Sequence, residues 1–93
     1  MYATIRIYGD RAGFAEALVE NEDAVRGLLT GIDGFKAYYL LKTAEGTASI
    51  SVFDDEAGAS ESTRAAGAWV GENLPQFAGT PPQVTSGEVV INF

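Results

Sequence analysis

A single arginine in the middle of an alternating N-terminal segment is the side chain whose chemistry stands out first. Arg6 lies between Thr4 and Tyr8 in a stretch with the period-two pattern of a β-strand. A strand inside a sheet rarely exposes such a charge freely, so the guanidinium needs a partner. We favour a carboxylate such as Glu88 as that partner, and the alternative is an anionic ligand or an enolate oxygen.

The only tryptophan is the second candidate. Trp69 falls in a predicted helix, Asn73 follows it one turn later on the same stripe, and the small residues 65–68 stand beside it. Small neighbours leave space, which is either a ligand cavity with the indole as one wall or ordinary core packing, and we favour the core. Of the four tyrosines, Tyr38 is the one that we assign to the pocket, although strands also favour tyrosine for packing alone.

The residue types that are missing exclude several chemistries. The sequence has no His and no Cys. A Ser-His triad, imidazole-bound zinc or haem, and thiolate chemistry are therefore absent. Asp54, Asp55 and Glu56 are consecutive acids of the kind that bind hard metals, but capping of a helix and its dipole explains them better. We therefore predict no metal site.

The length and charge of the chain restrict its partners. With 93 residues the sequence predicts one domain that spans residues 1–93. The net charge of −7 repels phosphate backbones and anionic membranes, so nucleic acid and membrane are excluded as partners. The sequence shows no export signal and no apolar run of membrane-spanning length, which predicts a cytoplasmic protein.

The elements that position these residues follow from periodicity. Alternation predicts strands over 3–8, 35–42, 47–53 and 84–93, and Gly46 supplies the positive φ of a short hairpin loop. A three-to-four spacing predicts one helix from about 12 to 31 and a second from about 56 to 73. The order β-α-β-β-α-β predicts an α+β ferredoxin-like plait with both helices on one face of the sheet.

Two glycines inside the second predicted helix need a reason. Each costs about 1 kcal/mol relative to alanine in a helix interior. Gly67 and Gly71 therefore predict a close approach of the helix to its neighbours or to a ligand.

The second predicted strand is apolar on both faces. Tyr38 and Leu40 alternate with Phe35, Tyr39 and Leu41, and the last predicted strand repeats the pattern. Two helices cover only one face of a sheet, and a large apolar patch left in water usually marks an interaction surface. We predict a homodimer in which a second protomer covers the other face.

Several short segments resemble those of small dimeric α/β-barrel proteins. They are GFKAYYL at 34–40, EGT at 45–47, and FDDEAGA at 53–59, which leads to AWV at 68–70. Over nearly its whole length the chain looks like the antibiotic biosynthesis monooxygenase superfamily, in which two ferredoxin-like protomers pack sheet to sheet. The resemblance also implies a homodimer.

The same resemblance implies an activity. Enzymes of this superfamily oxidise polyaromatic phenols with O₂ and without a metal or flavin, in an apolar pocket between helices and sheet. Trp69 matches the helix tryptophan of the family, but its usual catalytic asparagine is Ala65 here, and the histidine of the haem-degrading branch has no counterpart. The resemblance implies a cofactor-independent monooxygenase-like protein for a small aromatic metabolite. We predict that Trp69, Tyr38, Asn73 and Arg6 line its pocket, although Asn73 follows Trp69 whereas the asparagine of the family precedes the tryptophan. The alternative is a non-catalytic binding or accessory protein of the same fold.

Overall fold

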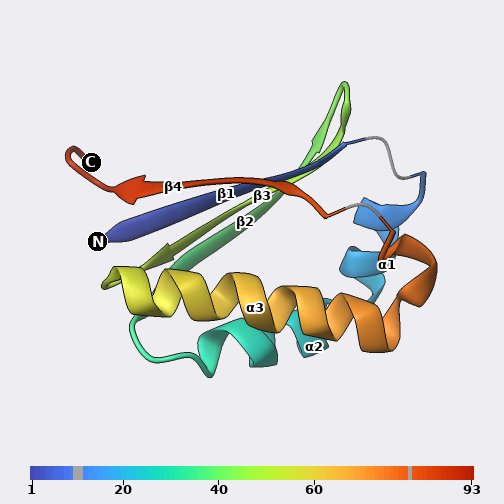
Figure 1. Ribbon diagram of the computed structural model, residues 1–93, viewed down its shortest axis with the longest axis horizontal. Helices are drawn as coiled ribbons and strands as arrows, with labels where there is room; N and C mark the ends of the chain where they lie inside the picture. The colour runs from blue at the N-terminus through green and yellow to red at the C-terminus, as the bar shows by residue number, and fades with distance from the viewer. Residues whose placement is uncertain (10–11, 80) are drawn as a thin grey trace.

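The predicted α+β plait is present in the structure. The computed structural model describes residues 1–9, 12–79 and 81–93. Its elements are β1 (Tyr2–Gly9), α1 (Phe14–Glu20), α2 (Glu22–Thr30), β2 (Phe35–Thr43), β3 (Gly46–Phe53), α3 (Glu56–Asn73), the 3₁₀ helix η1 (Pro75–Phe77) and β4 (Gln83–Glu88). The strands form one antiparallel sheet of order β2-β3-β1-β4. The α-helices lie together on one face of this sheet (Figure 1). Within the described residues, no helix is both long and apolar enough to cross a membrane.

The first helical segment is two helices, and the prediction of one continuous helix is wrong. The break is at Asn21, whose φ of −106° and ψ of 25° are not helical. The Asn21 side chain donates to the carbonyl of Ala17 at 2.8 Å, so it caps the end of α1. The carbonyl of the same residue accepts from the Val25 amide at 3.0 Å and so begins α2. Asparagine favours such positions because its short polar side chain competes for backbone groups.

The long helix α3 begins where the acidic residues predict. Asp55 is its N-cap, and the carboxylate accepts from the Gly58 amide at 3.0 Å. Asp54 instead pairs with Lys36 across the adjacent loop at 3.1 Å. The capping interpretation of these acids is confirmed. The helix ends at Asn73, ahead of Pro75.

Only one of the glycines in α3 is required by close packing. A Cβ on Gly58 would lie 2.9 Å from the Phe53 ring and 3.0 Å from the Asp33 carbonyl, so this glycine lets α3 approach β3. A Cβ on Gly67 or Gly71 would meet nothing within 4 Å. The prediction that Gly67 and Gly71 allow close packing against other parts of the chain is therefore wrong, and a close approach to a ligand stays a prediction.

The face of the sheet under the helices, the inner face, combines an apolar core with polar strand residues. The core cluster is Phe14, Leu18, Val70 and Leu74. Along β1 and β3, however, the inward side chains are largely polar. Those that are buried are Thr4, Arg6, Thr47, Ser49 and Ser51. Such groups are costly to bury without hydrogen-bond partners, so this polar stripe needs an explanation beyond packing.

The opposite, outer face of the sheet is apolar and open. Ile5 and Ile7 of β1 are 41% and 46% exposed, and Tyr39 and Leu41 of β2 are 60% and 40% exposed. Figure 1 shows the sheet lying over the helices, with this face turned away from them. The two-sided apolar character that the sequence indicates for β2 is therefore real, and its outer half lies at the surface.

One residue changes sides relative to the prediction. Phe35 was expected on the face of Tyr39, but it packs edge-on against Phe53 on the inner face, with ring centroids 5.7 Å apart. The cause is a β-bulge: Phe35 and Ala37 of β2 are opposite consecutive residues of β3, so Lys36 is an extra residue. Because of the bulge, the part of β2 before Lys36 points to the face opposite to the one that regular alternation predicts.

The last strand is shorter than predicted. The pairing of β4 with β1 ends at Glu88, which is opposite Tyr2, the first residue of β1. The residues after Glu88 therefore extend beyond the strand with which they could pair. One further backbone bond runs from the Val89 amide to the Met1 carbonyl at 2.8 Å. Beyond it the tail 89–93 projects past the N-terminal end of β1, with Val90 85% exposed (Figure 1).

Candidate functional site

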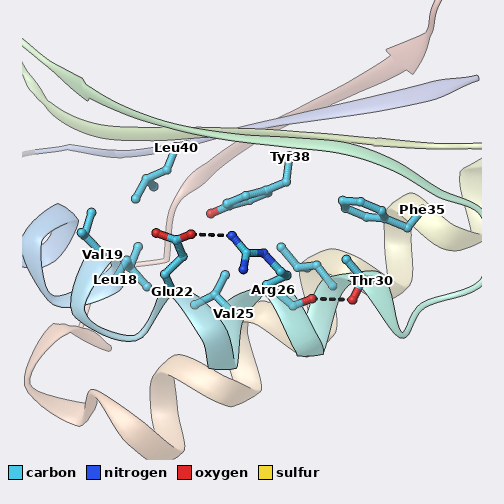
Figure 2. Close-up of a pocket in the computed structure, with 10 residues that line it drawn as sticks. Leu18, Val19, Glu22, Val25, Arg26, Thr30, Phe35, Tyr38 and Leu40 are labelled. Carbon is cyan, nitrogen blue, oxygen red and sulfur yellow. Dashed lines mark hydrogen bonds and ion pairs between the residues drawn. The ribbon is translucent and has the colours of Figure 1, made fainter.

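An apolar groove opens between the helices and the edge strand of the sheet. It has a volume of about 370 Å³ and is bounded by α1, α2 and β2. The side chains of Tyr38, Leu40 and Phe35 project from β2 toward α2 (Figure 2). Phe35 is part of this wall only because the bulge at Lys36 brings it to the inner face. The volume lies within the range of small-molecule pockets.

Two charged residues lie on the helical side of this groove. Glu22 and Arg26, one turn apart on α2, form an ion pair of 2.5 Å below Tyr38 and Leu40 (Figure 2). Their side chains are 61–63% exposed, so the pair is solvated and contributes little to stability. Arg26 also lies 3.6 Å from Asp23, which means that its charge is balanced by neighbouring carboxylates.

A second, smaller cavity lies deeper, between α3 and the sheet. Its volume is about 20 Å³, enough for one water-sized atom. Its walls include Arg6 and Tyr8 from β1, Tyr38 from β2 and Trp69 from α3. The groove and this inner cavity share four residues, which are Leu18, Val25, Leu29 and Tyr38. The two spaces are therefore adjacent, separated by the thickness of these side chains.

Arg6 is almost completely buried beside the inner cavity and is surrounded by hydroxyls. It is 1% exposed. Its Nε donates to Ser49 at 3.2 Å and its Nη2 donates to Ser51 at 2.6 Å. Its Nη1 donates to Ser62 and Thr63 of α3 at 3.4 and 3.0 Å. The guanidinium thus joins the two central strands to α3.

No carboxylate in the described part of the chain forms an ion pair with Arg6. The predicted partner Glu88 is opposite Tyr2, whereas Arg6 is opposite Val84, so the favoured Arg6–Glu88 pair does not form. Removing an ion from water costs several kcal/mol, and neutral hydroxyls offset that cost only in part. The inner cavity therefore borders a buried positive charge that the described residues do not neutralise.

The nearby tyrosine does not supply the missing negative charge. Burial raises the pKa of Tyr38, and Tyr8 raises it further, while the positive charge of Arg6 and the hydroxyl of Ser49 act in the opposite direction. Burial is the largest of these effects. Tyr38 is consequently a neutral phenol at physiological pH and can donate a hydrogen bond.

The structure brings together three of the four residues predicted to form a pocket. Arg6, Tyr38 and Trp69 all line the inner cavity. Asn73 lines neither this cavity nor the groove, because its exposed side-chain amide donates to the Trp69 carbonyl at 3.0 Å. Of the four tyrosines, Tyr8 joins Tyr38 at the inner cavity.

The hydroxyls around Arg6 were missed by reasoning from the sequence. Ser49 and Ser51 alternate with apolar residues in β3, which places both on one face of the sheet. This alternation was the available signal, but it gives the face without saying which residue of another strand lies beside it. Ser62 and Thr63 give no comparable signal, since serine and threonine are ordinary on a helix surface.

Comparisons with known proteins identify the fold. No known family model and no curated protein matches the chain. Several solved structures are similar to it, among them the following three. A mutant of the haem-degrader MhuD of Mycobacterium tuberculosis, with two manganese protoporphyrin IX molecules bound per active site, has a TM-score of 0.76 at 15% identity, covering 100% of this chain and 98% of MhuD. The ActVA-Orf6 monooxygenase of Streptomyces coelicolor, in complex with nanaomycin D, has a TM-score of 0.62 at 18% identity, covering 98% and 91%. A dimeric ferredoxin-like protein of unknown function from Jannaschia sp. CCS1 has a TM-score of 0.59 at 16% identity, covering 95% and 97%.

These similarities extend over almost the whole of each chain. The resemblance to antibiotic biosynthesis monooxygenase-like proteins, first drawn from short sequence segments, is confirmed for the fold. At such low identity the fold is what the chains share, and function has to be argued from the site.

Proposed function

We propose that this protein is a monooxygenase-like enzyme that oxidises a small aromatic or phenolic metabolite without a cofactor. The observation that carries the proposal is the apolar groove of about 370 Å³, walled by Tyr38 and adjacent to the cavity that Trp69 lines. Aromatic walls with few polar groups suit a flat, apolar ligand whose orientation is fixed by one or two hydrogen bonds. A monooxygenase and a haem-degrader are among the proteins of similar fold.

The side chains that line the groove and the inner cavity have different roles in binding. Phe35 and Leu40 contact the faces of an aromatic ring in the groove. Tyr38, as a neutral phenol, donates a hydrogen bond to a ligand oxygen. Trp69 of α3 forms part of the wall of the inner cavity, which lies next to the groove. A ligand that fills the groove excludes water, which strengthens these polar contacts.

The proposed reaction takes its electrons from the substrate. Loss of a proton makes the phenol an anion, which reduces O₂ directly. One oxygen atom replaces a ring hydrogen and becomes a carbonyl, the phenolic oxygen becomes a second carbonyl, and the other oxygen atom leaves as water with the ring hydrogen and the phenolic proton. The apolar groove favours this chemistry because O₂ is itself apolar and because the groove keeps bulk water away from the intermediate.

Oxygen uptake and calorimetric binding together test the proposal. We expect hydroquinones or naphthols to bind saturably and to increase oxygen consumption. Leu40→Phe narrows the groove and is expected to lower both signals at least tenfold. Ala68→Phe is the control, because it adds a phenylalanine at an exposed position of α3 that lines neither the groove nor the inner cavity. If no aromatic compound of the panel binds, the proposal is wrong.

A non-catalytic binding protein is the second candidate, and one residue favours it. Ala65, which is 8% exposed in α3, stands where the resemblance implies a catalytic asparagine. A methyl group cannot donate a hydrogen bond to a reacting oxygen. Saturable binding of aromatic ligands without oxygen uptake would favour this candidate over the enzyme.

The functional unit that we propose is a homodimer joined through the outer faces of two sheets. The chain exposes 5710 Å², whereas a monomeric protein of its mass exposes about 5,200 Å². Part of the excess is the outer face, where Ile5 of β1 and Tyr39 of β2 lie on either side of β3, each opposite Ile50. A second copy of the sheet would bury these side chains.

A further inference from the structure

The buried charge of Arg6 indicates which ligands the site selects. We propose that Arg6 is an anion subsite. The ligand in the groove carries an ionised oxygen on its ring, as a phenolate or a carboxylate, and this oxygen enters the inner cavity to pair with the guanidinium. The inference rests on the proposed binding of an aromatic ligand in the groove, and it adds the charge of that ligand.

The sizes of the two spaces fit such a ligand. The groove of about 370 Å³ has room for a ring system, whereas the inner cavity of about 20 Å³ has room for a single oxygen atom. Leu18, Val25 and Tyr38 line both, so the two spaces are adjacent and a polar group on a ring in the groove can be directed at the inner cavity. Tyr38 is the wall that has to turn, and it belongs to the edge strand of the sheet.

The charge distribution supports the same conclusion. A guanidinium has five N–H donors, and the described contacts of Arg6 are four hydrogen bonds, all to neutral hydroxyls. One Nη2 proton is therefore left over for another acceptor. The chain has 13 acidic residues, yet none in its described part pairs with this cation. A ligand oxygen can supply the negative charge that the protein does not provide.

The shell of hydroxyls holds the guanidinium ready for an anion. Ser49 and Ser51 fix Arg6 from β3, and Thr63 fixes it from α3, so binding does not have to order a flexible side chain. Hydroxyls also leave the positive charge intact, whereas a carboxylate in their place would cancel it and repel the ligand. The arrangement gives anion selectivity in a protein whose net charge of −7 disfavours anions at long range.

The test compares ligands of the same shape and different charge. Isothermal titration calorimetry at neutral pH would measure 2-naphthoate against neutral 2-naphthamide on the wild-type protein. A charge-assisted hydrogen bond to a buried guanidinium predicts that naphthoate binds about 10- to 100-fold more tightly. In the Arg6→Met variant this preference is expected to disappear while naphthamide still binds.

Arg64→Met is the matched control, because it removes the same charge from a solvated ion pair with Glu61 on α3 that lines neither the groove nor the inner cavity. It is expected to change the preference for naphthoate less than threefold. Circular dichroism checks that Arg6→Met is folded. If that variant does not fold, titration of bound 2-naphthol in the wild-type protein decides: burial alone raises the pKa of a phenol, so a pKa of the bound naphthol below its value in water requires the cation.

The outcomes separate this inference from the proposed function. Equal binding of naphthoate and naphthamide, with an unshifted naphthol, overturns the anion subsite and leaves the aromatic groove standing. Binding of neither ligand overturns both. A lowered naphthol pKa assigns the subsite to phenolates, and selective binding of naphthoate without that shift assigns it to carboxylates.

Discussion

The two faces of the sheet have the opposite of the usual arrangement. The inner face, which lies under the helices, carries Arg6, Ser49 and Ser51, all at most 1% exposed. The outer face, which no described element covers, carries Ile5 and Ile7 at 41% and 46% exposure. In a self-contained domain the apolar side of a sheet faces the core and the polar side faces water.

This inversion supports the proposal that the functional unit contains more than the single chain. Apolar residues on the outer face lose stabilisation as long as they contact water, about 25 cal/mol per Å². On the inner face, Ser49 and Ser51 are hydrogen-bonded, but the buried charge of Arg6 has no carboxylate partner among the described residues. The first fact points to a partner subunit, and the second points to a ligand. Both follow from the alternation of side chains along β1 and β3, which places polar residues on the inner face and apolar residues on the outer face.

The largest effect is expected from a charge on the outer face. Ile5→Asp puts two carboxylates into the proposed dimer interface, where burying them without partners costs about 3–5 kcal/mol. Sedimentation at micromolar concentration should show a dimer for the wild-type protein and a monomer for the variant. Val19→Asp, at another exposed apolar position but on α1, should remain dimeric. A wild-type monomer would remove the basis for a partner subunit.

The next largest effect is expected on the inner face. Ser51→Ala deprives Arg6 of its shortest hydrogen bond, at 2.6 Å, and leaves a charged donor unsatisfied. The free energy of unfolding should fall by about 1.5–3 kcal/mol, as measured with urea. Ser86→Ala breaks a bond between two neutral hydroxyls, to Thr4 at 3.1 Å, and should cost about 1 kcal/mol or less. Equal losses in the two variants would mean that the charge of Arg6 is not what its shell of hydroxyls stabilises.

A pair of glycine variants measures how closely the helices cover the inner face. Gly58→Ala forces a methyl group to within 2.9 Å of the Phe53 ring and should destabilise the protein by about 1–3 kcal/mol. Gly67→Ala, in the same helix but facing open space, should stabilise it by up to about 1 kcal/mol. Thermal unfolding followed by circular dichroism distinguishes the two. A destabilising Gly67→Ala would show that something covers this part of α3 in the functional protein.

The smallest effect is expected from the ionisation of Tyr38, which makes the free energy of unfolding depend on pH. Because burial raises its pKa above the ordinary 10.0, the folded protein holds this proton at a pH where the unfolded chain has lost it. The free energy of unfolding should therefore fall as pH rises above 10.0, and Tyr38→Phe should reduce the slope. Urea titrations at pH values on either side of 10.0 measure it, with Tyr39→Phe as a control for losing a hydroxyl from the outer face of β2. An unchanged slope would indicate that Tyr38 is more solvated than the inner face implies.

The features of the fold that local interactions determine could be predicted from the sequence. Gly46 has the positive φ expected in the hairpin, and Asp55 caps α3, because each depends on residues within a few positions. The break at Asn21 could not be predicted, since Leu18 and Val25 keep a helical spacing across it and pack against the same core. The spacing of apolar residues shows which face of a helix is buried. This spacing is the same for one continuous helix and for two consecutive helices that bury the same face.

The site could be predicted only as far as strand and helix geometry reaches. Alternation gives the face of Arg6, and helical spacing gives the face of Trp69. Neither rule gives the register between β1 and β4, which places Val84 rather than Glu88 opposite Arg6. That register depends on where β4 begins after η1, and no local pattern specifies it.

The extra residue Lys36 has a consequence for how such proteins can change. Because side chains in a strand point alternately to either side, a β2 that ran through Lys36 without the bulge would turn Phe35 outward, from the ligand groove to the surface that faces a second subunit. Deleting Lys36 would instead restore the ladder with Phe35 still opposite Phe53. The wall of the groove therefore depends on the bulge only as long as the extra residue is present, and a loss of one residue at this point would leave Phe35 in place.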